Sequence, residues 1–426
     1  MLWQDLRFAV RMFRKDLPVT LAAVASLALG IGFNTSLFTF LDAVLLRPIP
    51  VHDPARLVSV VSADKGESRY LPNSRPNYLD LRDQSTAFSG LTSFQALQVR
   101  FSVGERSELI LGQIVSGNYF DVLGIKPLLG RTFLPEDDQV PDARPVVVLG
   151  YSLWRKSFGS DPRIVGKDVR LNGRRFTIIG VTPRDFRGTG RFTVFKFWVP
   201  VMMSRAVFPL ADHVNDRDWR LFRIVGRLKP GITPARAESE VKAISRRLAS
   251  TYPRENHDQT ATIVPFMHEA VGPNSRALFV RAGAFLMTIA SLLLLGACAN
   301  VANLLLSRAS ARRQEMAIRM AAGAGRARIL RQLLTESLLL SLLGGGLGML
   351  IARASREVFL NVKNPLLAAD ALDLSLDSRV LFYALGISLL TGVLFGLAPA
   401  FQAFSTDPGL VLKGAAGLQP RGRKLW

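Results

Sequence analysis

Four long runs of apolar residues divide the chain into segments of very different length. The runs cover 19–41, 285–306, 333–352 and 380–404, and only the third contains a charged residue, Glu336, near its start. A helix needs about 20 apolar residues to cross the roughly 30 Å of hydrocarbon in a bilayer. The first run is longer than the apolar region of a signal peptide, and no small-residue cleavage site follows it. With their flanking residues, the runs predict transmembrane helices at 18–46, 277–306, 332–352 and 380–404.

The residues before the first span follow a helical period. Leu2, Leu6, Ala9 and Phe13 share one face, and basic residues lie between them. A helix of this kind lies along a membrane surface with its apolar face in the lipid. We therefore expect an amphipathic elbow helix at 1–17.

Charges outside the runs predict the orientation of the chain. Basic residues exceed acidic residues by two before the first span, by six in 307–331 and by three in 405–426, whereas 353–379 is neutral. Short loops rich in Lys and Arg stay on the cytosolic side of a membrane. We therefore expect both termini and 307–331 in the cytosol, with the loop 353–379 and the long segment 47–276 on the outer side.

The outer segment alternates between strand and helix patterns. Thr233 followed by Pro234 is typical of a helix start, and Asn172–Gly173 is typical of a hairpin turn. The order β-α-β-β, followed later by β-α-β, predicts a porter-like split βαβ sandwich with a β-rich insertion at about 124–205. The fold class is thus a membrane protein with an α-helical four-span bundle and an α+β outer domain. Within 47–276, strands are predicted at 55–62, 91–103, 105–116, 219–228 and 261–269, and helices at 77–88 and 233–252.

The composition agrees with a membrane protein. The 426 residues are 49% hydrophobic with a formal net charge of +21, and the mean hydropathy is +0.22. A charge of this size also occurs in nucleic-acid-binding proteins, but no aromatic residue lies among the arginines of 307–331 to stack on bases. We therefore expect no nucleic acid partner. The single cysteine, Cys298, and the scattered histidines predict neither a disulfide nor a metal site.

Motifs for catalysis are absent from the sequence. It contains no G-x-x-x-x-G-K-[ST] loop for ATP, no G-x-S-x-G nucleophile turn and no H-E-x-x-H zinc motif. We therefore predict no catalytic residue, cofactor or metal in this chain. The acidic run Glu136, Asp137 and Asp138 fits a solvated loop better than a Ca²⁺ site.

Polar residues within the spans are candidates for a role in the membrane. Glu336 lies near the cytosolic end of the third span, where a pair with Arg331 or Gln332 is expected. Asn300 and Asn303 share one face of the second span and are expected to join helices.

Glycine pairs in the last two spans predict close helix packing. Gly344–Gly348 and Gly392–Gly396 both have the G-x-x-x-G spacing that lets two helices approach. Packing within one subunit is the simpler interpretation, and an interface between two subunits stays open.

The segment 307–331 carries seven arginines and one acid between two spans. Residues 310–321 have the pattern of a short helix, and Ala-Gly-Ala-Gly at 322–325 ends it. This helix would present Met316 and Met320 as apolar contacts. A short exposed helix of this kind suits docking in a partner's groove, and binding to anionic lipid is the alternative.

Longer stretches of the sequence resemble one known family. GQIVSGNYFDVLGIKPLLGRTF at 112–133, the residues from VVVLGYSLW to IIGVTP at 146–183, and RRQEMAIRMAAGAGRARILRQLLTESLLL at 312–340 carry the resemblance. Together they are similar to MacB/FtsX-type permeases of ABC transporters. The stretch LALGIGFNTSLFTFLDAVLLRPIP at 27–50 resembles one unit of the acidobacterial duplicated orphan permeases.

The resemblance implies a fold, a location and partners. Each unit would have four transmembrane helices in the bacterial inner membrane and a periplasmic domain between the first two. A homodimer or second permease unit would bind a separate cytosolic ABC ATPase, and a periplasmic or outer-membrane partner is compatible with the family. Members act in efflux or mechanotransmission, in which ATP-driven motion reaches the periplasmic domain. The residues implied to meet the ATPase are Arg312, Arg313, Glu315, Met316, Arg319 and Met320.

Other functions stay open at the level of sequence. A membrane-anchored sensor, whose outer domain binds a ligand, would need no ATPase. A membrane-tethered hydrolase is disfavoured because no nucleophile or acid/base set is recognisable. Duplicated orphan permeases contain two copies of the unit, whereas one copy is found here, so a single-unit protein and a part of a longer chain are both compatible with the sequence.

Overall fold

The computed structural model describes residues 2–47, 49–64, 70–208, 211–272, 274–311, 326–361 and 376–405. The chain divides into two compact units. Of the described residues, the helical unit comprises those up to Ala43 and those from Arg281 onward. The outer domain comprises the described residues of Val44–Val280.

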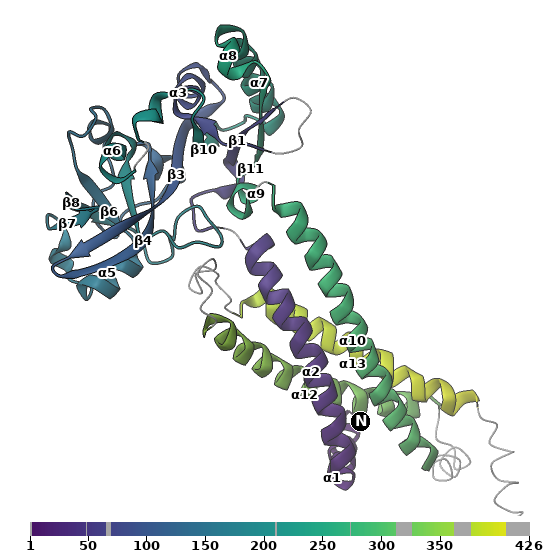
Figure 1. Ribbon diagram of the computed structural model, residues 1–426. Helices are drawn as coiled ribbons and strands as arrows, with labels where there is room; N and C mark the ends of the chain where they lie inside the picture. The colour runs from purple at the N-terminus through teal and green to yellow at the C-terminus, as the bar shows by residue number, and fades with distance from the viewer. Residues whose placement is uncertain are drawn as a thin grey trace, which may run out of the picture. The chain divides into compact units, whose positions relative to one another are not determined.

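Long helices make up the helical unit (Figure 1). In the described residues, four of them are long and apolar enough to cross a membrane. The predicted fold class, a four-span bundle with an α+β outer domain, is confirmed. The helices are α1 (Leu2–Lys15), α2 (Leu17–Leu41), α10 (Arg276–Ala311), α12 (Arg326–Asn361) and α13 (Ser378–Ser405).

The helix α12 occupies the middle of the helical unit. It packs along α2 on one side and along α13 on the other. Both its ends extend past the apolar run, since charged residues are tolerated outside the hydrocarbon layer. Leu27 of α2, Leu340 of α12 and Phe395 of α13 are almost completely buried and belong to one cluster.

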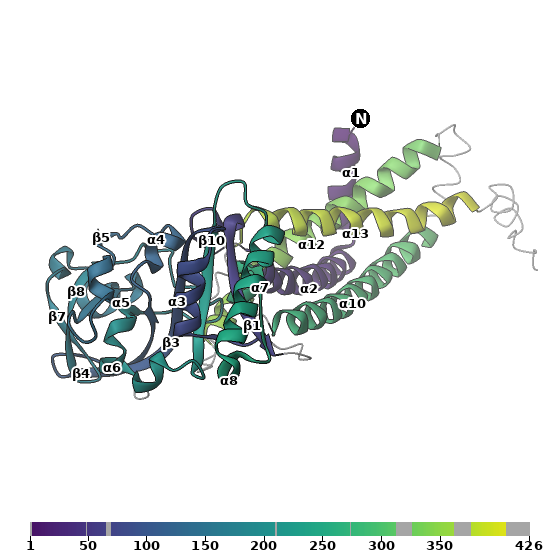
Figure 2. The same ribbon diagram turned by 90° about the horizontal axis from the view of Figure 1, so that it is seen from above.

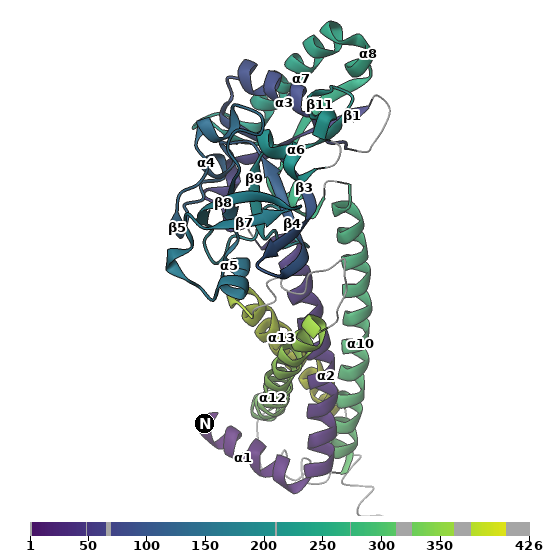
Figure 3. The same cartoon turned by 60° about the vertical axis from the view of Figure 1, so that its left-hand side comes forward.

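The first helix, α1, is amphipathic, and its apolar face meets other helices. Ala9 and Phe13 are buried in the same cluster as Leu27 and Leu340, whereas Arg11 and Arg14 are exposed. Figure 3 shows α1 meeting α2 at an angle at one end of the bundle. The apolar stripe that suggested contact with lipid is therefore partly used for packing within the protein.

The outer domain is built on one sheet, in which the described strands follow the order β11-β1-β10-β3-β4-β9-β6-β8-β5. Two further strands lie off this path: β2 pairs with β10, and β7 pairs with β3 and β8. The strands are β1 (Leu57–Asp64), β2 (Asn73–Ser74), β3 (Phe88–Val103), β4 (Arg106–Val115), β5 (Leu129–Gly130), β6 (Val146–Leu149), β7 (Asp168–Leu171), β8 (Arg174–Val181), β9 (Phe197–Pro200), β10 (Arg220–Leu228) and β11 (Gln259–Pro265).

Helices cover this sheet at several places. The longest, α7, has its N-cap at Thr233, whose side chain accepts a hydrogen bond from the main-chain N–H of Arg236, as the Thr-Pro pair predicted. The helices are α3 (Arg75–Gln84), α4 (Tyr119–Leu123), α5 (Tyr151–Phe158), α6 (Ser204–Val207), α7 (Pro234–Thr251), α8 (Pro253–Asn256) and α9 (Phe266–Val271).

The strands β11, β1, β10 and β3 form the predicted split βαβ arrangement. All three strand pairs in this part are antiparallel, and α3 and α7 connect strands that are not neighbours. Figure 2 shows α3 and α7 beside these strands. Tyr78 and Leu81 of α3 pack with Val241 and Ile244 of α7 in one buried cluster.

The residues between β4 and β10 continue the same sheet. β9 pairs with β4 in parallel, β6 lies between β9 and β8, and β7 closes onto β3. The insertion is therefore β-rich, as predicted, but its strands are hydrogen-bonded to those of the split βαβ part. Asn172 and Gly173, both with positive φ, form the predicted turn between β7 and β8.

Three local predictions were incomplete or wrong. The helix predicted at 77–88 ends at Gln84, and Phe88 begins the strand β3. The helix α5, which buries Leu153 and Trp154, was not predicted. The strand predicted to reach Glu269 ends at Pro265, and Phe266 begins the helix α9. Proline cannot donate a ladder hydrogen bond, and Phe266 is buried in the core beside β1 rather than continuing the edge strand.

Candidate functional site

The predicted ATPase-coupling residues lie outside the part of the chain that the structure describes. They are Arg312, Arg313, Glu315, Met316, Arg319 and Met320, and the described helices α10 and α12 end and begin on either side of them. Their role therefore stays a prediction. The candidate site that can be built from described residues is the set of contacts by which the spans hold one another.

The helices α2 and α12 touch main chain to main chain at a pair of glycines. A Cβ atom on Gly348 would lie 2.9 Å from the main-chain nitrogen of Gly32 and 3.1 Å from the main-chain oxygen of Ala28. A Cβ atom on Gly344 would lie 2.6 Å from Cβ of Leu27. The pair Gly344–Gly348 thus faces α2 within the same chain, and neither position has room for a side chain.

The helices α12 and α13 meet through glycines and serines. A Cβ atom on Gly396 would collide with the hydroxyl of Ser337, and one on Gly392 would collide with that of Ser341. Both hydroxyls donate to main-chain oxygens of their own helix, so each is paired although fully buried. The two G-x-x-x-G pairs therefore lie in two different seams, one on each side of α12.

The predicted intramembrane polar residues have different surroundings. Glu336 is 9% exposed, and it and Arg331 each take part in a polar or electrostatic contact. Asn300 and Asn303 are exposed on α10. Their predicted role in joining helices therefore has no partner within the described part of this chain and stays a prediction.

A different asparagine joins α2 to α10. Asn34 is fully buried, and its Nδ2 donates to the main-chain oxygens of Gly30 at 2.9 Å and Ala290 at 2.8 Å. Asn34 was not among the predicted residues, although an amide inside an otherwise apolar run is the signal that would have identified it.

A second residue that was not predicted from the sequence lies immediately after α2. Asp42 is fully buried immediately after the apolar run, and its carboxylate lies 3.5 Å from Nη1 of Arg379 at the start of α13. One turn away, the rings of Phe38 and Tyr383 are stacked with centroids 4.1 Å apart. An acid at the boundary of a span is a functional candidate by default.

The acidic run of the outer domain is only partly solvated: Glu136 is exposed, whereas Asp137 is buried and Asp138 is half-buried. Asp137 is almost fully buried and lies 2.6 Å from Nη1 of Arg131, whereas Asp138 accepts main-chain hydrogen bonds from Gly117 and Met202 at 2.9 Å. These cationic and amide donors explain why the acids can be buried. In the described residues, no group of three or more possible ligands is placed to hold a metal ion.

The two acids differ in pKa. Burial by itself raises the pKa of Asp137, but hydrogen bonds from Arg131 and from the Leu134 amide outweigh it, so the pKa is lowered. Burial is the dominant influence on Asp138 and raises its pKa, although main-chain donors oppose the shift. The contacts of both acids hold this part of the insertion in place and do not create a reactive group.

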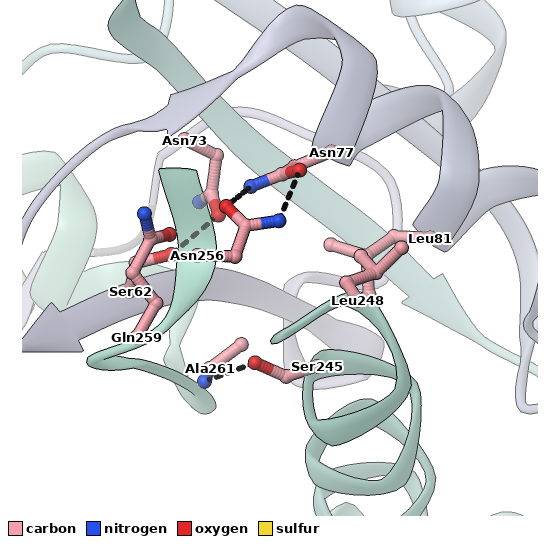
Figure 4. Close-up of a pocket in the computed structure, with 9 residues that line it drawn as sticks. All are labelled: Ser62, Asn73, Asn77, Leu81, Ser245, Leu248, Asn256, Gln259 and Ala261. Atoms are coloured by element: carbon pink, nitrogen blue, oxygen red, sulfur yellow. Dashed lines mark hydrogen bonds between the residues drawn. The ribbon is translucent and has the colours of Figure 1, made fainter. Parts of the chain in front are cut away.

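A small polar cavity lies in the split βαβ part (Figure 4). Its volume of about 10 Å³ is enough for about one water molecule. The side-chain amides of Asn77 and Asn256 bond to each other at 3.1 and 3.2 Å, and Ser62 donates to Asn73 at 2.6 Å. These side chains mostly bond to one another, so the cluster ties α3 to α8 and has no room for a substrate.

The fold and the packed spans define a membrane-protein class with four candidate spans and a large α+β domain inserted after the first span. Residues 20–244 match the MacB-like periplasmic core domain, and residues 287–408 match the FtsX-like permease C-terminal region. The chain therefore belongs to the MacB/FtsX-type ABC transporter permease family, and the resemblance found in the sequence is confirmed.

Several known proteins are similar to this chain. The macrolide export ATP-binding/permease protein MacB of Chromobacterium violaceum is 29% identical over 316 residues, which cover 74% of this chain and 44% of that protein. MacB of Escherichia coli K12 is 28% identical over 297 residues, which cover 69% of this chain and 42% of that protein. The matches thus span less than half of these relatives. The periplasmic region of MacB from Actinobacillus actinomycetemcomitans has 19% identity and a TM-score of 0.37, covering 50% of this chain and 90% of that structure.

Proposed function

We propose that this chain is the permease subunit of a MacB/FtsX-type ABC transporter that passes ATP-driven motion from a cytosolic ATPase to a periplasmic domain. One observation carries the proposal. The match to the MacB-like core domain includes most of the first candidate span, and an FtsX-like permease region covers most of the other three, all in one chain. The activity would be efflux or mechanotransmission, and the names of the relatives make export the first activity to test.

The contacts within the helical unit support a route for the motion. The proposed ATPase contact lies between α10 and α12 in the chain, so a push there would act directly on both helices. The glycine contact of Gly32 with Gly348 leaves no compressible side chain between α12 and α2. Close-packed elements without voids move together rather than deform. α2 would then carry the motion along the chain into the outer domain, which begins at Val44.

The same proposal includes the location and the partners. The chain would lie in the bacterial inner membrane with both termini in the cytosol and the outer domain in the periplasm, as the distribution of basic residues predicts. ATP hydrolysis would occur in a separate subunit, and the permease would act as a homodimer or beside a second permease unit.

Co-purification tests the proposal. The intact chain is isolated from its native membranes in mild detergent, beside a variant with Glu315, Met316, Arg319 and Met320 changed to alanine. The matched control changes Arg246 and Arg247, which are exposed on α7, to alanine. We expect an ABC-type ATPase to co-purify with the intact chain and the control, and to be lost from the fourfold variant.

Two results would contradict the proposal. If the ATPase is absent from all three preparations, a sensor without an ATPase becomes the better explanation. If the ATPase stays with the fourfold variant, the docking segment is assigned to the wrong residues.

A further inference from the structure

Two side-chain contacts join the end of α2 nearest the outer domain to the start of α13. The rings of Phe38 and Tyr383 stack with centroids 4.1 Å apart and planes 5° apart. One helical turn closer to the outer domain, Nη1 of Arg379 lies 3.5 Å from Oδ1 of Asp42. The spacing is four residues on both helices, so the two contacts follow one another along a single seam.

The two members of the ion pair differ in exposure. The side chain of Asp42 is 0% exposed, whereas that of Arg379 is 54% exposed. A carboxylate can be buried at the end of a span only where a cation or a hydrogen-bond donor meets it. Arg379, which is half exposed, supplies such a cation to the buried carboxylate of Asp42.

A strip of buried polar residues continues from Asp42 toward the middle of α2. Thr39 and Thr35 follow at helical spacing on the same face and are 7% and 0% exposed. Thr39 Oγ1 donates to the main-chain oxygen of Thr35 at 2.7 Å. Among the described residues, Thr35 Oγ1 has no hydrogen-bond partner. A buried hydroxyl without a partner is costly, and access of water removes the cost.

We propose that the Asp42–Arg379 pair and the Phe38–Tyr383 stack form a gate that closes this polar strip and opens to admit water along α2. In the closed state the strip is dry and the carboxylate is held by Arg379. Because α2 runs on into the outer domain, a pull on that domain separates Asp42 from Arg379. Only the source of this pull rests on the proposed function; the gate itself is a property of the isolated chain.

Thiol accessibility of the full-length chain in lipid nanodiscs tests the gate. Cys298 is the only native cysteine, so Cys298→Ser provides the background. Thr39→Cys is placed in the strip, and its reaction with a charged, membrane-impermeant methanethiosulfonate reagent is timed with and without Arg379→Gln. Ser337→Cys, fully buried in the seam between α12 and α13, is the matched control for general loosening of the bundle.

We expect slow but measurable labelling of Thr39→Cys, because the labelling rate follows the population of the open state. Arg379→Gln should accelerate the labelling of Thr39→Cys about tenfold or more, and it should leave the labelling rate of Ser337→Cys unchanged. The exchanged pair Asp42→Arg with Arg379→Asp should restore slow labelling. The gate is supported only if all three of these labelling results are observed.

Three results would overturn the gate. An unlabelled Thr39→Cys in the background protein means that the seam does not open. An unchanged rate in Arg379→Gln means that the pair does not close it, and equal acceleration at both cysteines means that Arg379 stabilises the whole bundle. Since no ATPase is present, none of these results bears on the permease assignment, and a failure of the co-purification test would leave them unaffected.

Discussion

The contact between Gly32 and Gly348 gives the sharpest mutational test of the helical unit. Gly348→Ala would place a Cβ atom 2.9 Å from one main-chain atom of α2 and 3.1 Å from another. Main-chain atoms cannot rotate away, so α2 and α12 must separate by several tenths of an ångström. Overpacking of this kind costs about 1–3 kcal/mol. Replacing glycine by alanine within a helix opposes this cost by about 1 kcal/mol.

A control in the same helix separates these two effects. Gly346 lies two residues away in α12, and nothing is within 4 Å of the position where its Cβ would be. Gly346→Ala therefore receives the gain in helix propensity without the collision. We expect Gly348→Ala to be less stable than Gly346→Ala by about 1–3 kcal/mol.

The free energy of unfolding is measured for the full-length chain in mixed micelles with increasing denaturing detergent. Gly32→Ala meets the main-chain oxygen of Gly348 at 2.9 Å and should behave like Gly348→Ala. The double variant should lose less free energy of unfolding than the two single variants lose together, because helices that have already moved apart accept the second methyl group. Equal stability of Gly348→Ala and Gly346→Ala would refute the close contact. A loss of self-association without a loss of stability would assign the glycines to an interface between subunits.

Two further predictions concern the outer domain. Thr233→Ala removes the hydrogen bond from the Arg236 amide that caps α7. It should lower the free energy of unfolding by about 0.5–2 kcal/mol, measured by chemical denaturation. Asp137 has a pKa below its ordinary value of 3.8, so the folded state keeps it ionised where the unfolded chain takes up a proton. Its contribution to stability is therefore present above about pH 3.8 and is lost as the pH falls through the lowered folded-state pKa. Asp137→Asn should flatten this part of the stability–pH curve, and an unchanged curve would show that the Arg131 pair does not act through charge.

Much of the architecture could be predicted because it follows from local periodicity. The apolar runs are long enough to require spans, and Leu97, Val99 and Phe101 alternate with polar residues as in a half-buried strand. The Thr233–Pro234 start and the Asn172–Gly173 turn depend on the conformational preferences of two adjacent residues, so they could be identified without knowledge of their neighbours.

The contacts between elements could not be predicted in the same way. Three of the spans are apolar on every side, so their pattern does not show which face meets another helix. The placement of Gly348 against Gly32, and of Gly396 against Ser337, was decided by how the helices rotate and cross. The strands of the insertion joined the main sheet because hydrogen-bonding partners far apart in sequence became neighbours.

The sequence by itself determined the number of spans, the class of the outer domain and the family, since each depends on residue types and their spacing. Only the tertiary structure decided that Asn34 bonds to α10, that Arg379 pairs with Asp42, and that Asp137 is buried. A polar side chain in or beside an apolar run has the same sequence signature whether it faces lipid, solvent or a partner. Whether burial of that side chain costs free energy depends on its partner, which lies elsewhere in the chain.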